Sequence, residues 1–192
     1  MSGPSKGKIS KMQMYIIGGI LSAVLIATAA FVIFTPKQAE VPSATLSSVY
    51  STMADTQDIT KEAGKNIRSS QLRGINVSID STLLSTMQSL EAPLESSGNK
   101  PSSLRSAAKK DPIRDSELRE KLEEARLLVM YDRVYLTQFT FKIEEIMRQI
   151  KYVQARTRSE STVQSLESGH DNLEALKSSL DNFANSSDSN SL

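Results

Sequence analysis

Residues 118–153 read LREKLEEARLLVMYDRVYLTQFTFKIEEIMRQIKYV, and inward positions recur along them at alternating steps of four and three. This spacing is typical of an α-helix with one side against a core. Acidic residues gather before the stretch and basic residues after it, as the helix dipole favours. We predict one long helix over 112–157, of which roughly 42 residues would reach about 60 Å. Its inner face consists of Leu118, Leu122, Ala125, Val129, Asp132, Leu136, Phe139, Ile143, Ile146, Ile150 and Val153.

A second apolar row runs along the same helix at Leu127, Val134 and Phe141. A helix with two apolar rows contacts two neighbours, which favours a bundle over a two-stranded coiled coil. Alternating strand patterns are not evident elsewhere in the sequence. The predicted fold class is therefore all-α, with an elongated antiparallel bundle of three or four helices.

The other predicted helices follow from the same periodicity and from turn residues. We expect a polar linker at 93–111 and a disordered polar tail at 185–192. Gly74 should end the first helix, although a kink in one continuous helix is the alternative. Pro93 should end the second helix, and a capping box at Ser161–Gln164 should start the last one. Besides 112–157, the predicted helices are 43–72, 75–92 and 161–184. The inner face predicted for the last of these consists of Val163, Leu166, His170, Leu173, Leu176, Leu180 and Phe183.

A different kind of helix is predicted at Met14–Phe34, MYIIGGILSAVLIATAAFVIF, which is apolar and uncharged throughout. A helix of this length spans about 30 Å, the thickness of a bilayer's hydrocarbon core. Lys6, Lys8 and Lys11 precede it, which predicts a cytoplasmic N-terminus. Cleavage as a signal peptide near Ala27-Thr28-Ala29 is the main alternative, and a buried core helix is another.

Together these expectations describe a membrane-anchored protein with one exported domain. Residues 1–13 form a cytoplasmic tail, 14–34 the single transmembrane helix and 35–42 a neck. Residues 43–184 form the extracytoplasmic helical domain. The expected location is the cell membrane, crossed once.

Composition argues against several functions. Three of the 23 basic residues precede the apolar run, which leaves 20 against 22 acidic residues, too balanced for nucleic-acid binding. The chain has no cysteine and one histidine, so disulfides, thiolate metal sites and a cysteine nucleophile are excluded. No glycine-rich phosphate loop or G-x-S-x-G motif is present. We expect no enzyme activity, no cofactor and no small-molecule substrate.

Asp132 is the one charged residue on the inner face of the long helix. A lone buried carboxylate costs several kcal/mol, so Asp132 requires a cation or a donor from another helix. We predict a structural pair with Arg73, with Arg68 as the next candidate. Exposure of Asp132 to water and a ligand site are the alternatives.

His170 and Glu167 have the E-x-x-H spacing of di-iron bundles. A second histidine and further inward carboxylates are missing from the sequence pattern, so we predict no metal and a packed or half-exposed imidazole. Two other motifs occur readily by chance. Small residues four apart, such as Gly19 and Ala23, can bring two membrane helices together. The triplets that begin at Asn76 and Asn185 match glycosylation acceptors.

The stretch Glu124–Leu127, continuing through Tyr131–Tyr135 to Ile143–Met147, resembles uncharacterised single-pass membrane proteins of candidate-phylum bacteria such as Saccharibacteria. The resemblance covers mainly the predicted long helix. It implies a bacterial cell membrane and carries no functional residues.

The sequence therefore predicts a membrane-anchored helical scaffold or interaction protein of the cell envelope. Its expected partners are the lipid bilayer and another envelope protein or a second copy of the chain. A sensory ectodomain acting through a separate membrane partner is the first alternative function. A ferritin-like metal-binding bundle is the second.

Overall fold

The computed structural model describes residues 44–111 and 115–189, and these residues form six α-helices and no strand. The all-α prediction is confirmed for this part of the chain. The helices are α2 (Leu46–Ala63), α3 (Ser70–Ser96), α4 (Pro101–Lys110), α5 (Ser116–Leu127), α6 (Tyr131–Gln154) and α7 (Glu160–Ser189). None of these helices is long and apolar enough to cross a bilayer. The predicted tail, membrane helix and neck at 1–13, 14–34 and 35–42 lie outside the described residues.

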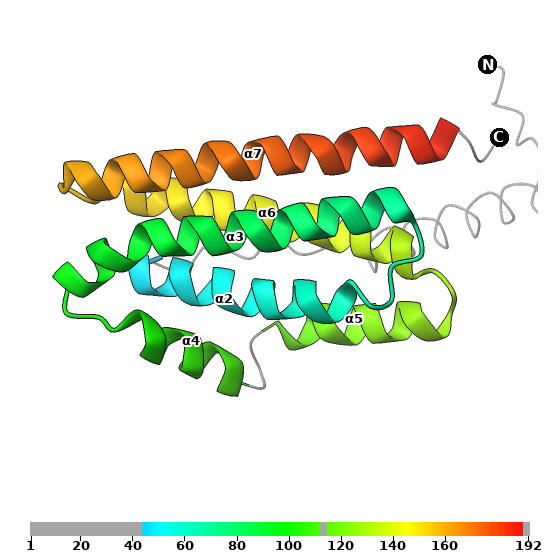
Figure 1. The fold of residues 1–192 in the computed structure, drawn as a ribbon, viewed down its shortest axis with the longest axis horizontal. Coiled ribbons are helices and arrows are strands. Elements are labelled where there is room, and N and C mark those ends of the chain that lie inside the picture. Colours follow the sequence, from blue (N-terminus) through cyan, green and yellow to red (C-terminus); the bar gives the residue numbers. More distant parts are fainter. Residues whose placement is uncertain (1–43, 112–114, 190–192) are drawn as a thin grey trace, which may run out of the picture. The chain divides into compact units, whose positions relative to one another are not determined.

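Four of the helices surround one core (Figure 1). Helix α2 lies beside α3 and α6, and α7 lies beside the same two helices. Each of the four runs antiparallel to its two neighbours. The shorter helices α4 and α5 pack outside this bundle, α4 against α2 and α5 against α6. The connection from α3 to α6 therefore passes along the outside of the bundle.

The core is built from the apolar faces of these four helices. Burial of each large apolar side chain contributes about 1.5–3 kcal/mol to the hydrophobic term. The predicted inner face of α7 is confirmed at Leu166, Leu173 and Leu180, which have no exposed surface. The largest fully buried side chains are those of Tyr50, Tyr135, Phe139, Met53, Ile59, Leu72, Ile79, Leu83, Met87, Leu90, Leu94 and Ile143.

The first predicted helix, 43–72, is wrong at its end, because α2 stops at Ala63 and Gly64 is its C-cap. The chain then turns, and Ser69 starts α3 by accepting the Leu72 N–H with its Oγ at 3.3 Å. Gly74 lies inside α3, so it is neither a turn nor a helix end. The alternating spacing of the first predicted helix continues through the turn between α2 and α3, so the sequence pattern does not reveal this turn.

The second predicted helix, 75–92, is also wrong, because α3 continues through Pro93 to Ser96. Its end is set by Gly98, whose φ of 78° lies in the left-handed region. Asn99 N–H donates to the Leu94 carbonyl at 3.0 Å, and Gly98 N–H donates to Glu95 at 2.9 Å. This is a Schellman motif, for which glycine is the preferred residue. The predicted linker 93–111 instead contains α4.

The long helix predicted over 112–157 is divided into α5 and α6, which form a hairpin with its turn at Leu128–Met130 (Figure 1). Val129 has φ 61°, and Met130 N–H donates to the Ala125 carbonyl at 3.0 Å. The turn is therefore a Schellman-type end with valine where glycine is usual. None of the six described helices reaches 60 Å, and the predicted inner face is wrong at Val129, which is exposed. The predicted face is confirmed from Phe139 onward.

The last helix is longer than the predicted 161–184. Ser159, before the predicted capping box, accepts the Thr162 N–H with its Oγ at 3.3 Å. Helix α7 begins at Glu160 and continues to Ser189. The tail predicted to be disordered at 185–192 is therefore helical as far as 189, and 190–192 lie outside the described residues.

Candidate functional site

Three features of the described residues could carry function: a buried charge cluster, a histidine group and an exposed apolar turn. The charge cluster lies where α2, α5 and α6 meet. Asp55 of α2 is 1% exposed. Arg119 of α5 donates from Nη2 to Asp55 Oδ1 at 2.8 Å and from Nη1 to Glu62 Oε2 at 2.7 Å. This guanidinium links α5 to two positions of α2 that lie about two helical turns apart.

The cluster continues onto α6 through Lys142, whose side chain is 8% exposed. Its Nζ donates to Asp115 Oδ1 at 2.6 Å and to Glu145 Oε2 at 3.0 Å. Gln149 Nε2 donates to Glu145 Oε1 at 2.9 Å. Burial lowers the pKa of Lys142, but the Asp115 and Glu145 carboxylates outweigh burial, so its pKa is raised. The lysine therefore stays charged and links α6 to the start of α5.

Asp55 is the titrating group of this cluster. Burial raises its pKa to about 6, with a further increase from the Asp115 carboxyl and a partial decrease from Arg119. Asp55 Oδ2 is buried and has no hydrogen-bond partner among the described residues, and the same holds for Asp115 Oδ2. Asp55 Oδ2 is therefore the oxygen that remains to hold a proton. A buried carboxyl with a partner of like charge takes up a proton well above the usual pH.

A cleft of about 480 Å³ borders the cluster between α2, α4 and α5. Asp58 and Lys109 face each other across it at 3.7 Å, and Arg119 closes one side through its pairs with Asp55 and Glu62. Each cation of the cluster and its cleft, namely Arg119, Lys142 and Lys109, forms an ion pair with a carboxylate. The cluster therefore links the helices by ion pairs. The one chemical change that its groups leave open is protonation of Asp55.

Helix α4, which lies within the predicted linker 93–111, is held by a second polar group. Arg105 Nε donates to the Tyr50 hydroxyl at 2.7 Å, and its Nη2 donates to Glu91 Oε1 at 2.9 Å. Tyr50 also donates to Glu91 Oε1 at 3.1 Å. Burial raises the pKa of Tyr50, although Arg105 opposes this increase. The three side chains come from three helices, so local sequence gives no sign of their contact.

Asp132, the predicted buried charge, does have donors from another segment, but they are backbone groups. Its Oδ1 accepts the Arg68 N–H at 2.9 Å and its Oδ2 accepts the Ser69 N–H at 2.7 Å. No ion pair joins it to Arg73 within the described residues, so the predicted partner was wrong. The physical reason is the earlier turn: the free N–H groups that precede α3 lie at 68–69, beside the first turn of α6.

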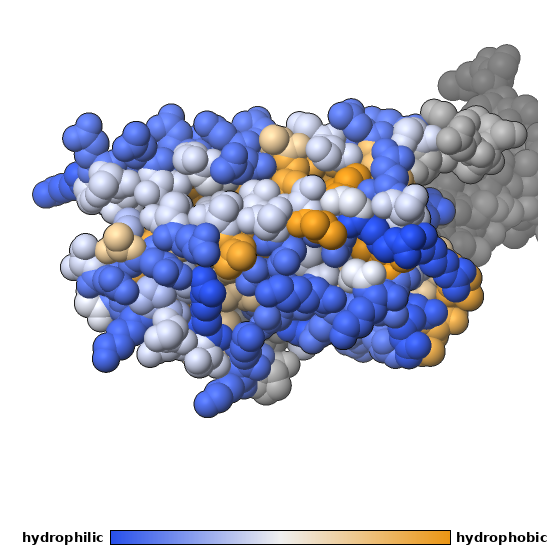
Figure 2. All heavy atoms as spheres, viewed as in Figure 1, coloured by the Kyte–Doolittle hydropathy of each residue, from blue (hydrophilic) through white to orange (hydrophobic). Residues whose placement is uncertain are grey.

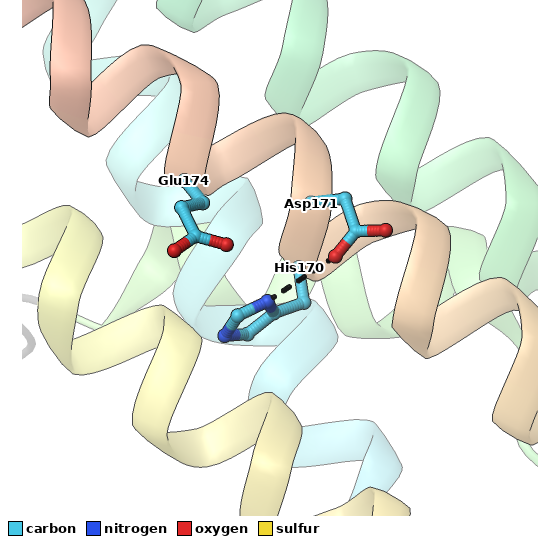
Figure 3. A group of neighbouring side chains, drawn as sticks. All are labelled: His170, Asp171 and Glu174. Atoms are coloured by element: carbon cyan, nitrogen blue, oxygen red, sulfur yellow. Dashed lines mark ion pairs between the residues drawn. The ribbon is translucent and has the colours of Figure 1, made fainter.

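His170, the only histidine, lies on α7 beside Asp171 and Glu174 (Figure 3). One ligand atom from each of the three lies within 4.8 Å of the others. The imidazole is 12% exposed and its Nδ1 lies 3.6 Å from Asp171 Oδ1, while the carboxylate of Asp171 is 71% exposed. Glu167, the predicted partner, is not in this group. Three ligands from one helix with two exposed carboxylates leave a divalent cation largely hydrated, so the group is a weak metal site.

The first glycosylation triplet is closed off by the fold. Asn76 is 6% exposed, and its Oδ1 accepts the Tyr135 hydroxyl at 2.7 Å inside the bundle. Burial raises the pKa of Tyr135 well above its usual value, so the hydroxyl remains a donor. The Asn76 side chain is therefore a core hydrogen-bond acceptor.

The exposed apolar turn joins α5 to α6 and consists of four consecutive residues, Leu127–Met130, which we call the apolar tip. Their exposed fractions are 68%, 60%, 65% and 46%. Figure 2 shows the hydrophobic colour gathered at this end of the α5–α6 hairpin, next to strongly hydrophilic side chains. The signal was present in the sequence, because four apolar residues in a row do not fit a helix with one apolar face.

No protein-family model, curated protein or solved structure matches the chain. The residues themselves therefore carry the functional argument.

Proposed function

We propose that this chain is a single-pass membrane protein that holds a helical scaffold or interaction domain outside the cytoplasmic membrane. The proposed anchor is the apolar run Met14–Phe34, and the lysines before it favour a cytoplasmic N-terminus. The described helices would then lie on the outer side, and their function would be to contact another component of the envelope.

The observation that carries the interaction function is the apolar tip. A well-packed bundle seldom exposes a contiguous group of large apolar side chains unless the surface binds something. Elsewhere the large apolar residues of the described helices are mostly buried, and Val77 and Phe141 are single exposed exceptions. The tip is therefore a distinct surface and not a consequence of poor packing.

Membrane fractionation tests the anchor. The full chain should remain in the membrane pellet after an alkaline carbonate wash, because the apolar run holds it in the bilayer. A double substitution within the run, Leu21→Arg and Ile26→Asp, should release it, since charges at the bilayer centre are costly. Recovery of the unsubstituted chain in the supernatant would contradict the proposal.

Photo-crosslinking tests the interaction function. A photoreactive benzoylphenylalanine at Leu128 should form adducts in native membranes. The same group at Val77 is the matched control, because Val77 is 65% exposed but lies alone on α3. Equal adducts from both positions would mean that the tip is not a binding surface.

A further inference from the structure

We infer that the apolar tip docks on the anionic surface of the bilayer in which the chain is anchored, with its side chains inserted among the lipids and nearby cations on the headgroups. This inference rests on the proposed membrane anchor. It gives the bundle a second contact with the membrane and hence a defined orientation.

The shape of the turn supports insertion. Val129 has a positive φ, and the Met130 N–H returns to the Ala125 carbonyl, so the tip is a fixed, hydrogen-bonded knuckle. A positive φ is unfavourable for a β-branched residue, and strain of this kind is often retained where a surface has a function. The turn displays Leu127, Leu128 and Val129 to solvent, and more than half of each residue's surface is exposed.

The charges around the tip point to an anionic partner. Four exposed basic residues belong to the segments next to it and make no ion pair within the described residues: Lys65, Arg68, Arg73 and Arg133. The α2–α3 turn, which contains the first two, is bound directly to the start of α6 through Asp132. Basic side chains around an apolar group are typical of binding to anionic lipid.

Most acids near this end are already engaged. Glu123 pairs with Arg126, and Glu62 accepts from Arg119 at 2.7 Å. Both carboxylate oxygens of Asp132 accept hydrogen bonds from backbone N–H groups. Glu120 and Glu124 of α5 are the neighbouring acids without an ion pair in the described residues, against four such basic residues, so positive charge is in excess. The same excess disfavours pairing of this end with a second copy of itself.

The length of chain between the anchor and the bundle permits the contact. Nine residues, 35–43, separate the apolar run from the first described residue. Fully extended, they reach about 30 Å. Helix α2, which leads from that point toward the end of the bundle that carries the tip, is about 27 Å long (Figure 1). The tip can therefore reach the same bilayer.

The absence of cysteine makes a direct test possible, because one introduced thiol labels one site. The full chain with Leu128→Cys, carrying an environment-sensitive fluorophore, is placed in nanodiscs at one molecule per disc. The discs contain phosphatidylcholine alone, or phosphatidylcholine with about one third phosphatidylglycerol. We expect blue-shifted emission and quenching by acyl-chain spin labels in the anionic discs. The same label at Val77→Cys should report water in both.

The cations are tested by Arg68→Gln, Arg73→Gln and Arg133→Gln in the labelled chain. Each should lower the docking equilibrium constant about fivefold in anionic discs, and added salt should have a similar effect. Lys151→Gln, on the last turn of α6 at the other end of the bundle, is the matched control and should change nothing.

Three results would overturn the inference. The label at Leu128→Cys could remain in water in both lipids, or its emission could be identical with and without anionic lipid. Alternatively, its blue shift could occur only when several molecules share a disc, which would make the occupant a second copy of the chain. In each case the chain would still be recovered in the discs, so the proposed anchor would survive. Failure to recover the chain in any disc would overturn both.

Discussion

Ser69 and Asp132 join the starts of two helices that are 63 residues apart in sequence: the Ser69 backbone N–H donates to Asp132 Oδ2 at 2.7 Å. The other oxygen of the same carboxylate accepts the Arg68 N–H. A carboxylate at this point satisfies two N–H groups of the turn before α3, and its charge suits the positive end of that helix dipole. The contact fixes the α2–α3 turn against the α5–α6 turn.

Replacing Asp132 should therefore weaken the fold. Asp132→Asn keeps one acceptor oxygen but turns an NH₂ group toward the second N–H, at a cost of about 2 kcal/mol in the free energy of unfolding. Urea unfolding of the full chain in mild detergent, followed by circular dichroism, measures this cost. Arg73→Ala is the control and should stay within about 0.5 kcal/mol of the parent. An equal decrease in the free energy of unfolding for Arg73→Ala would support the ion pair between Asp132 and Arg73 that the sequence predicts.

The raised pKa of Asp55 predicts that stability falls as pH rises. Between pH 3.8 and about 6 the folded chain keeps a proton on Asp55 that the unfolded chain releases. The folded state therefore binds more protons, and the free energy of unfolding decreases over this range by up to about 3 kcal/mol. The stabilisation is fully present below the unfolded pKa and is lost as pH passes the folded value. Unfolding measured in urea at a series of pH values checks the slope.

Asp55→Asn is the decisive variant for this slope. Its amide can still accept from Arg119, and it imitates the protonated acid beside Asp115 without titrating. It should be more stable than the parent at pH 8, with little pH dependence between 4 and 6. Glu62→Gln removes the negative charge of the other acceptor of Arg119 and should keep the slope. A pH-independent parent would contradict the prediction.

Helices α3 and α7 meet closely at Gly169. A Cβ atom added there would lie 2.5 Å from the Thr86 Cγ2 methyl, which is buried. Gly169→Ala should destabilise the fold by about 1–3 kcal/mol although alanine favours helix. Adding Thr86→Ser removes that methyl and should recover most of the loss, as thermal unfolding can show.

Gly74 supplies the contrasting substitution. It lies inside α3, and a Cβ atom there would meet nothing within 4 Å. Gly74→Ala should therefore stabilise the fold by about 1 kcal/mol, the difference in helix propensity. A loss of stability in the same thermal experiment would favour the turn expected at this glycine from the sequence.

At Val129 we expect the stability of the fold and the docking of the apolar tip to change in opposite directions on substitution. A left-handed conformation costs an L-residue about 1–2 kcal/mol, so Val129→Gly should raise the free energy of unfolding by about 1 kcal/mol. It should also weaken docking on anionic discs, because it removes an exposed apolar side chain. Leu128→Ala, at a residue with φ −90°, should weaken docking without the gain in stability. Equal stability of Val129→Gly and the parent would show that the turn is not strained.

Periodicity in the sequence predicted the features that depend on local amphipathicity. Leu166, Leu173 and Leu180 of α7 and the residues of α6 from Phe139 onward face the core as expected. Each of these helices carries its own apolar face, and a spacing of three and four residues is enough to reveal it. The all-α class followed for the same reason.

Helix ends were poorly predicted because the pattern passes through them. The steps of four and three continue across Val129, where the chain reverses with a left-handed residue that is not glycine. Pro93 and Gly74 predict helix boundaries, yet both lie within α3. A proline can remain near a helix end, and Gly98, with its positive φ, was the true stop.

The sequence by itself determined that this chain is helical and which sides of α6 and α7 are apolar, because those properties reside in the spacing of neighbouring residues. Only the tertiary structure decided that α5 folds back on α6, that Asp132 binds backbone N–H groups at 68–69, and that Asp55 meets Arg119. Those partners are far apart in sequence, and their contact depends on where separate helices come to lie. A charged residue on an apolar face indicates in the sequence that it requires a partner, but only the packing of the helices decides which group is that partner.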